Sequence, residues 1–173
     1  MVDGKKSLLT VKEIALMGMM LATIEAVKLA LGFIPGVELV TLLIILYTLF
    51  FEKKVLYIIP AFILIEGVIY GFGIWWVMYA YIWPLLILLT YQFRKQQSVW
   101  FWSVFSGFFG LLFGALCSIV YLFVGGPKMA FAWWVAGIPT DILHGISNFV
   151  ICAILFNPLN LALKKLRNYT EPG

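Results

Sequence analysis

A few ionisable side chains interrupt otherwise apolar stretches of this sequence, and they are the first place to look for chemistry. They are Glu25, Lys28, Glu38, Glu66, Asp141 and His144. At the centre of a lipid bilayer such a group costs about 2.5–3.5 kcal/mol on insertion scales, so each needs a role. Asp141, His144 and Asn148 are spaced i, i+3 and i+7, which puts them on one face of a helix. That face could bind a ligand, or it could pack as a polar seam against other helices.

The remaining ionisable residues each have a structural alternative. Glu25 and Lys28 are spaced i, i+3, and we expect them to neutralise each other on one helix face. Glu38 follows a proline–glycine turn, where a carboxylate in the first turn of a helix complements the helix dipole, so we expect a capping role. Glu66 has no basic neighbour in the sequence. Its carboxylate could contact a ligand or form a hydrogen bond with another helix, and the sequence does not favour either role.

The composition indicates lipid rather than water as the solvent of this chain. Apolar residues make up 64% of the 173 positions and charged residues only 12%, with a mean hydropathy of +1.04. Soluble domains are about half apolar and a quarter charged. A bilayer admits helix bundles and closed barrels, and continuous apolar runs such as 39–51 lack the alternation of barrel strands. We predict an all-α integral membrane protein with a single domain, residues 1–173.

Six stretches are apolar enough to predict transmembrane helices. They are residues 10–33, 37–51, 54–71, 74–93, 98–124 and 129–163. About 20 residues cross the hydrocarbon core, so the second helix is short and the last one long. Pro139 and Pro158 predict a kink and a bend in the last helix. The first stretch lacks a small-residue cleavage site, so we expect a retained helix rather than a signal peptide.

Lysine and arginine distinguish the two sides of the membrane. Ten of the 12 fall on one side: Lys5, Lys6, Lys12, Lys53, Lys54, Arg94, Lys95, Lys164, Lys165 and Arg167. The loops of the other side contribute only Lys128, and Lys28 lies inside the first helix. Because positive charge collects in cytoplasmic loops, we expect both termini in the cytoplasm.

With this orientation, the six ionisable residues all fall in the outer half of the membrane. Eight aromatic residues lie near the same outer helix ends: Tyr70, Trp75, Trp76, Tyr79, Trp83, Tyr121, Trp133 and Trp134. Such residues form belts at membrane surfaces, but a belt does not account for carboxylates and a histidine at the same depth. Polar groups that converge in an aromatic-lined concavity are typical of a small-molecule site. We therefore predict a pocket that opens to the outside.

Two stripes of small residues predict close approach between helices. The fifth predicted helix carries Gly107, Gly110, Gly114 and Ser118. We expect that stripe to pack inside the bundle. The first helix carries Ala15, Gly18, Ala22, Ala26 and Ala30. This second stripe could pack internally or could dock a membrane partner.

The sequence lacks the motifs that would indicate an enzyme. It contains no G-x-x-x-x-G-K-[ST] phosphate loop, no H-E-x-x-H and no G-x-S-x-G. A single histidine and two separated cysteines, Cys117 and Cys152, make a zinc site improbable, and the cysteines are expected to be buried thiols. We expect no catalytic residue, no metal and no cofactor in this chain. Because the basic residues sit in short loops and tails, we expect a lipid bilayer and not a nucleic acid as the partner.

These features together resemble the substrate-binding S component of the energy-coupling factor (ECF) vitamin importers of bacteria. The resemblance covers essentially the whole chain, with its length, six helices and inside termini. It also rests on the alanine-rich first helix and on three segments: LTVKEIAL at 9–16, FIPGVEL at 33–39, and the stretch from Trp133 to Asn148. It implies a multi-pass protein of the bacterial cell membrane.

The resemblance also implies partners and a set of site residues. An S component binds its vitamin from outside, and a transmembrane T subunit couples it to two ATPases that use ATP and Mg²⁺. In the family, outer loops and outer helix ends form the pocket. With Glu66 added, the corresponding residues are Phe33, Glu66, Tyr70, Trp75, Trp76, Tyr79, Trp83, Trp133, Asp141, His144 and Asn148. The family's small-residue surface on helix 1 implies docking through Ala15, Gly18, Ala22 and Ala26.

The expected function is high-affinity binding of a water-soluble vitamin for an ECF importer. Tryptophan and tyrosine faces with nearby polar groups suit a pyrimidine or pyridine vitamin such as hydroxymethylpyrimidine, pyridoxine or thiamine, and a cation would gain from stacking on Trp. A wider pocket under the glycine-rich loops could instead accept a bulky corrinoid such as cobalamin. The thiamine pattern is poorly reproduced, since Phe33 stands where that pattern has a tryptophan. The alternative is a self-sufficient secondary transporter, for which inverted repeats are expected and none is seen.

Overall fold

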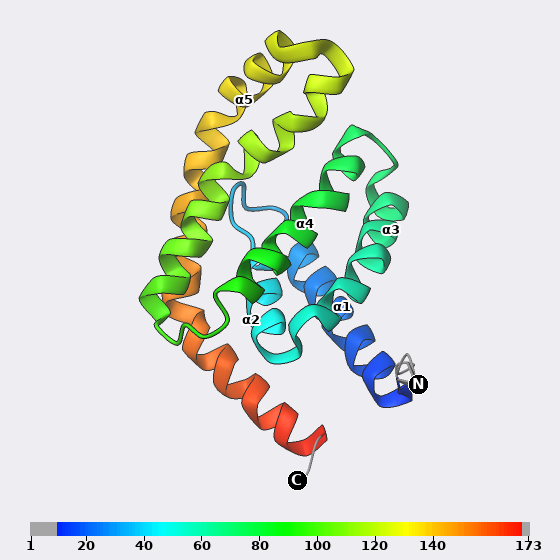
Figure 1. Ribbon diagram of the computed structural model, residues 1–173, viewed down its shortest axis with the longest axis vertical. Helices are drawn as coiled ribbons and strands as arrows, with labels where there is room; N and C mark the ends of the chain where they lie inside the picture. Colours follow the sequence, from blue (N-terminus) through cyan, green and yellow to red (C-terminus); the bar gives the residue numbers. More distant parts are fainter. Residues whose placement is uncertain (1–9, 171–173) are drawn as a thin grey trace, which may run out of the picture.

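The computed structural model describes residues 10–170, and 89% of these residues are helical. The elements are α1 (Val11–Leu31), α2 (Val40–Phe51), the 3₁₀ helix η1 (Glu52–Tyr57), α3 (Ile58–Tyr70), α4 (Ile74–Gln92) and α5 (Val99–Thr170). Figure 1 shows their arrangement. No strand occurs in this range, so the all-α prediction is confirmed for the described residues. Lys5 and Lys6, which entered the charge count, lie outside them.

Helix α5 is not one straight rod, although it runs over 72 residues. Gly126 has φ 77° and ψ −176°, a conformation that breaks the helix and is open to glycine, and Pro127 follows it. The chain reverses there, so a first arm (residues 99–125) and a second arm (residues 127–170) lie side by side (Figure 1). These arms correspond to the predicted helices 98–124 and 129–163. The connection is shorter and the last helix longer than expected.

The last part of the second arm runs at an angle to the rest. In Figure 1 the red C-terminal portion turns away from the orange portion that precedes it. Pro158 lies inside this arm and removes one backbone hydrogen-bond donor, as does Pro139 further up. A bend near Pro158 is what the sequence predicts.

Three helices are long and apolar enough to cross a membrane, namely α1, α4 and α5. Helices α2 and α3 have only 12 and 13 residues. At 1.5 Å per residue they reach about 18–20 Å, short of the roughly 30 Å of a hydrocarbon core. The long helices indicate association with a membrane, whereas the two short ones do not have the length of the spans predicted for them.

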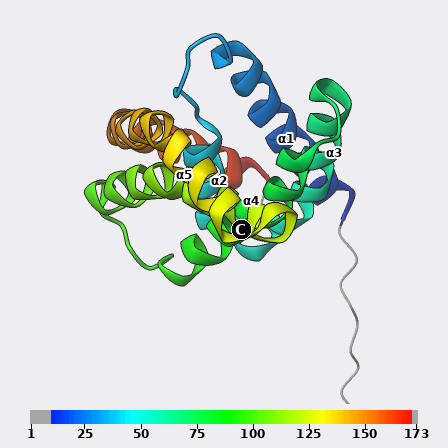
Figure 2. The same cartoon turned by 90° about the horizontal axis from the view of Figure 1, so that it is seen from above.

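Helix α2 forms the centre of the molecule. Each residue from Val40 to Thr48 is buried, as expected of a helix that is apolar on all sides. It contacts α1, α4, α5 and η1. Seen from above, it lies between the α5 arms and the side formed by α1 and α3 (Figure 2). Other helices therefore surround α2, which explains how so short an apolar helix is accommodated.

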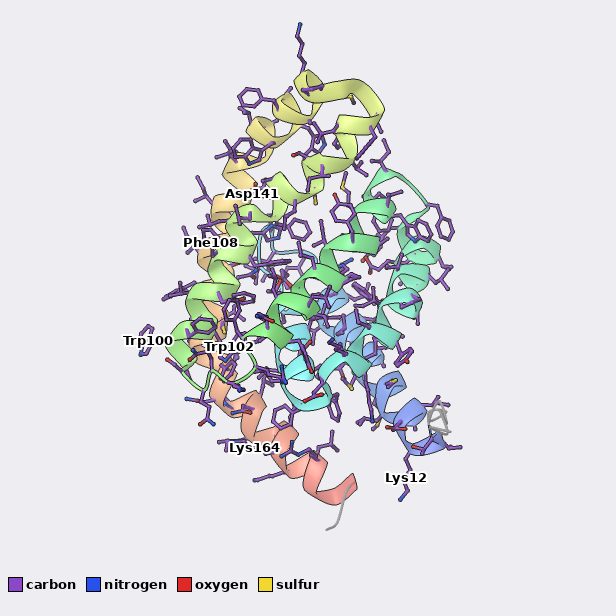
Figure 3. The ribbon with its side chains drawn as sticks, viewed as in Figure 1. Lys12, Trp100, Trp102, Phe108, Asp141 and Lys164 are labelled. Atoms are coloured by element: carbon purple, nitrogen blue, oxygen red, sulfur yellow. The ribbon has the colours of Figure 1, made fainter. Side chains whose placement is uncertain are left out.

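The outer surface of the molecule is apolar. Val68 on α3 is 77% exposed, and Phe108 and Ile154 on the two arms of α5 are 61% and 64% exposed. Figure 3 shows Phe108 and Trp100 pointing away from the bundle. A surface of this kind suits lipid tails and would be a liability in water.

Both ends of the described chain lie at the same end of the molecule. Figure 3 shows Lys12 near the start of α1 and Lys164 near the end of α5 at this lower end. Thr10 and Glu13 form a reciprocal capping box there, which stabilises the start of α1. The turns at 71–73 and at Gly126 lie toward the opposite end (Figure 1).

The glycine stripe of the first α5 arm packs against the second arm, and the prediction of internal packing is confirmed. A Cβ on Gly110 would lie 2.8 Å from the backbone oxygen of His144, and one on Gly107 would lie 3.0 Å from that of Gly145. A Cβ on Gly114 would lie 2.3 Å from a carboxylate oxygen of Asp141. Small residues thus allow the two arms to approach at backbone distance.

Candidate ligand-binding site

Two adjoining cavities lie among the predicted site residues. The first, here called the Trp83 cavity, has a volume of about 140 Å³ and is lined by Lys28, Glu38, Val40, Tyr79, Trp83, Phe113, His144 and Asn148. The second, here called the Glu66 cavity, has a volume of about 430 Å³ and is lined by Lys28, Gly32, Glu66, Tyr70, Trp75 and Tyr79. Lys28 and Tyr79 belong to both linings, so these two side chains stand at the boundary between the cavities.

Lys28 forms an ion pair with Glu66 that joins α1 to α3. The side chain of Glu66 is 1% exposed and that of Lys28 is 23% exposed. The ammonium group also lies 5.0 Å from the ring centre of Tyr70 and 5.2 Å from that of Tyr79. Burial strengthens such a pair, and the aromatic faces add cation–π attraction.

The expected pairing of Lys28 with Glu25 differs from what the structure shows. Glu25 is buried, and both of its carboxylate oxygens lack a hydrogen-bond partner among the described residues. Lys28 still interacts electrostatically with Glu25 and with Glu38. The i, i+3 spacing brings the charges near each other, but the partner that Lys28 contacts comes from another helix, which no local pattern reveals.

The loop between α1 and α2 is attached to the second arm of α5. Gly36 has φ +74°, and a Cβ there would lie 2.8 Å from the Cβ of Leu143. The backbone oxygen of Gly36 accepts a hydrogen bond from the hydroxyl of Ser147. The loop is therefore held against the face of α5 that carries His144, at the edge of the Trp83 cavity.

Glu38 ends this loop and caps α2. Its carboxylate accepts hydrogen bonds from the backbone N–H of Thr41 at 2.9 Å and from the hydroxyl of Thr41 at 2.5 Å. The capping role expected from the sequence is thus present, although Glu38 precedes the N-cap residue Leu39. The same side chain also lines the Trp83 cavity, which the sequence reasoning did not foresee.

Asp141 faces the first arm of α5 rather than either cavity lining. Its Oδ1 accepts a hydrogen bond of 2.9 Å from the backbone N–H of Gly114, and its side chain is buried. Figure 3 shows it on the second arm, beside the first. At this position the polar stripe acts as a seam between helices, which was the alternative to a ligand contact.

His144 and Asn148 do line the Trp83 cavity. The imidazole packs edge-on against Phe113 with ring centres 5.6 Å apart, and its Nδ1 has no partner among the described residues. Asn148 donates a hydrogen bond of 3.4 Å to the hydroxyl of Thr41. These two members of the i, i+3, i+7 stripe are available to a ligand in the cavity.

Trp83 is the most informative of the aromatic residues. It is 3% exposed, packs edge-on against Tyr79 at 5.4 Å, and lines the cavity named after it. Its indole Nε1 has no acceptor within the described part of the chain. A buried indole N–H usually finds a partner, so a bound molecule with an acceptor atom would complete this environment.

The other predicted aromatic residues fall into two groups. Trp75 and Tyr70 line the Glu66 cavity. Three lie outside both linings: Trp76 donates to the backbone oxygen of Ile63 at 2.8 Å, Phe33 is 78% exposed, and Trp133 stacks on Tyr121 at 5.1 Å. Lys28, Glu38 and Phe113 are lining residues that were not among the site residues predicted from the sequence. Lys28 and Glu38 could have been found from the sequence, because a charged side chain in an apolar stretch is costly and indicates a role. Phe113 is one apolar residue among many and could not.

The small-residue stripe of α1 points away from the bundle. Ala15, Gly18, Ala22 and Ala26 are all exposed, and nothing lies within 4 Å of a Cβ placed on Gly18. The stripe therefore does not pack inside the bundle, which was one of the two roles considered for it.

A further cavity of about 300 Å³ lies at the other end of the molecule. It lies between the start of α1 and η1, over an apolar floor, with Lys12, Glu13 and Lys54 among its lining residues. Glu13 and Lys54 pair at 2.5 Å. Within residues 10–170 no group of His, Cys, Asp or Glu is arranged to hold a metal ion. This cavity contains neither the aromatic cluster nor the polar stripe, so we place the ligand site at the Trp83 and Glu66 cavities.

The chain matches no protein-family model, and neither the curated proteins nor the solved structures contain a significantly similar one.

Proposed function

We propose that this chain is the substrate-binding subunit of an ECF-type importer and binds a small water-soluble vitamin or vitamin precursor. The observation that carries the proposal is the pair of adjoining cavities, lined by aromatic rings and by costly polar groups. In particular, the buried Trp83 N–H and His144 Nδ1 have no partners in the described residues. Unsatisfied groups around a cavity within an apolar helical protein are the general features of a small-molecule site.

The proposed topology has six membrane-crossing or membrane-embedded segments with both termini in the cytoplasm. Supporting it, the described ends and the basic residues Lys12 and Lys164 share one end of the molecule (Figure 3). The short α2 is surrounded by other helices, whereas α3 keeps one apolar face exposed.

The size of the cavities favours a ligand of one ring over a corrinoid. The Trp83 cavity of about 140 Å³ is smaller than a typical ligand pocket of about 300–1,000 Å³, and only the addition of the Glu66 cavity brings the space into that range. A pyrimidine or pyridine vitamin such as hydroxymethylpyrimidine or pyridoxine suits these dimensions. Cobalamin would require the loops to open widely.

In this proposal the chain does not transport alone. A transmembrane T subunit would dock on the exposed small-residue stripe of α1, and two ATPases carrying ATP and Mg²⁺ would drive uptake. The exposure of Ala22 and Gly18 supports this docking face, because small residues permit close helix approach in lipid.

Reconstitution separates the proposal from its alternative, a self-sufficient secondary transporter. The purified chain is placed in proteoliposomes with its copurifying small molecule, radiolabelled, once alone and once with an ECF module and internal ATP. We expect binding in both samples and uptake only with the module and ATP. Uptake by the chain alone, driven by an ion gradient, would establish the secondary transporter instead.

A further inference from the structure

The charges around the candidate site do not balance. Lys28 pairs with Glu66 and shares the lining of the Trp83 cavity with Glu38, while Glu25 lies three residues before Lys28 on α1. Lys28 is the only lysine or arginine among the residues that line the two cavities. Of the two carboxylates that line the cavities, Glu38 and Glu66, the ammonium of Lys28 offsets one, so the linings carry one more carboxylate than cation.

The carboxylates are not neutralised by other contacts within the described residues. Both oxygens of Glu25 and the Oε1 of Glu66 have no hydrogen-bond partner there. Glu38 accepts two hydrogen bonds from Thr41, which carries no charge. A buried carboxylate without a counter-charge is strongly unfavourable. An additional positive charge in the cavities would therefore stabilise the site.

The aromatic lining is suited to the same charge. The Lys28 ammonium already lies over the faces of Tyr70 and Tyr79. Trp83 and Phe113 add two more ring systems on the Trp83 side, with ring centres 5.9 Å apart. Aromatic faces attract cations, and tryptophan does so most strongly.

The hydrogen-bonding groups specify a second feature of the ligand. The buried Nε1 of Trp83 can only donate, and it lacks an acceptor in the described chain. Asn148 can donate to the same molecule, since it lines the same cavity. The bound molecule should therefore carry an acceptor atom, such as a ring nitrogen or a hydroxyl oxygen, besides its positive charge.

We infer that the two cavities bind a flat heteroaromatic molecule that is positively charged at neutral pH, with the charge near Glu38 and Tyr79 and an acceptor atom toward Trp83. The inference rests on the proposed function and narrows its substrate class. It disfavours anionic vitamins, and among ring-sized ligands it favours amines and quaternised rings over neutral alcohols.

Matched pairs of probes test the charge directly. Pyridoxamine and pyridoxine differ by an ammonium in place of a hydroxyl group, and so do the aminomethyl and hydroxymethyl forms of 4-amino-2-methylpyrimidine. Binding of each to the purified full-length chain is measured by quenching of tryptophan fluorescence. For whichever pair binds, we expect the charged member to have a Kd at least tenfold lower than that of the neutral member. We also expect mass spectrometry to identify the molecule that copurifies with the chain as a cation. Equal affinities within that pair, or a neutral or anionic copurifying molecule, would overturn the inference.

Two carboxylate variants locate the effect. Glu38→Gln removes a carboxylate from the lining of the Trp83 cavity, and Glu25→Gln, which breaks no hydrogen bond of the described chain, is the second variant in case the first does not fold. Each should weaken binding of the charged member while leaving that of the neutral member little changed. Glu52→Gln, on the 3₁₀ helix η1 far from the cavities, is the matched control. An equal loss for both members in both variants would contradict a charge-specific role.

The outcome is distinguishable from failure of the proposed function. If a neutral molecule binds and is taken up only with an ECF module, the proposed function stands and the charge inference falls. If the chain copurifies with no small molecule and binds none of the four probes, the proposed function falls, and the inference falls with it.

Discussion

The arrangement around Trp83 shows how single residues define the candidate site. Its indole lies in the core, yet its N–H has no acceptor within the described residues, and it borders a cavity with His144 and Asn148. A buried donor left unpaired costs about 1–3 kcal/mol. A ligand that accepts this hydrogen bond recovers that energy on binding, so the residue favours the occupied state.

The variant Trp83→Phe tests this role. It keeps a ring in the core but removes the donor, and the loss of one hydrogen bond of about 1 kcal/mol should raise the Kd of the copurifying ligand about five- to tenfold. Trp100→Phe is the control, because Trp100 is 70% exposed and points away from the bundle (Figure 3). Isothermal titration of both variants provides the measurement. An unchanged Kd in Trp83→Phe would remove Trp83 from the site.

The sequence located some of these residues but not their partners. The cost of burying charge singled out Lys28 and Glu66 separately, because that cost depends on residue type and hydrophobic surroundings alone. Their ion pair joins residues 38 positions apart, and such a contact depends on how α1 packs on α3. Phe113 looked like any other apolar helix residue, so nothing in the sequence distinguished it as a lining residue.

At the scale of elements, the loop between α1 and α2 borders the Trp83 cavity through Glu38. It begins after α1, packs against Leu143 through Gly36, and receives a hydrogen bond from Ser147. It then ends at Glu38, which caps α2. The loop thus connects three helices that surround the ligand site, and its position on α5 should control access to the cavity.

The variant Gly36→Ala should weaken ligand binding by displacing this loop. Gly71→Ala provides a control for backbone strain, because both glycines have a positive φ that an alanine rarely adopts. Only Gly36 would place its new Cβ against another residue, 2.8 Å from Leu143, whereas nothing lies within 4 Å at Gly71. We expect a larger rise in Kd for Gly36→Ala, measured by titration calorimetry. Equal effects would mean that the loop contact does not matter for binding.

The positions of most helices along the chain could be predicted from the sequence, whereas the lengths of α2 and of the last helix could not. Apolar runs and the proline–glycine breaks gave helix boundaries within a few residues for α1, α3 and α4, since these signals are local. The sequence predicts a loop where the chain reverses near Gly126. In the structure, Gly126 is the single residue of non-helical conformation at this reversal. Helix α2 is shorter than a span because its neighbours, rather than lipid, surround it. That is a tertiary property.

At the scale of the whole molecule, the binding site and the exposed stripe of α1 are separate features. The polar residues Glu25 and Lys28 of α1 face the bundle, whereas Ala22 and Ala26 on the same helix face outward. One helix can therefore contribute to ligand binding with one face and to partner docking with the other. This separation predicts that the two functions can be lost independently.

The variant Ala22→Trp tests the separation. A bulky ring on the exposed stripe should prevent close approach of a partner helix and reduce ECF-dependent uptake at least tenfold, while ligand binding stays unchanged. Ile154→Trp, at an exposed apolar position of α5, is the control for adding a large ring to the lipid-facing surface. Uptake and binding are measured on the same preparations. Loss of binding in Ala22→Trp would indicate damage to the fold instead.

Native mass spectrometry of the purified chain tests the central claim most directly. The account predicts that one small water-soluble molecule remains bound per chain, and that His144→Ala, which opens the lining of the Trp83 cavity, removes most of it without preventing purification. A chain that retains no small molecule after exposure to a soluble cell extract would contradict the account. So would a bound molecule whose occupancy is the same in His144→Ala as in the unaltered protein.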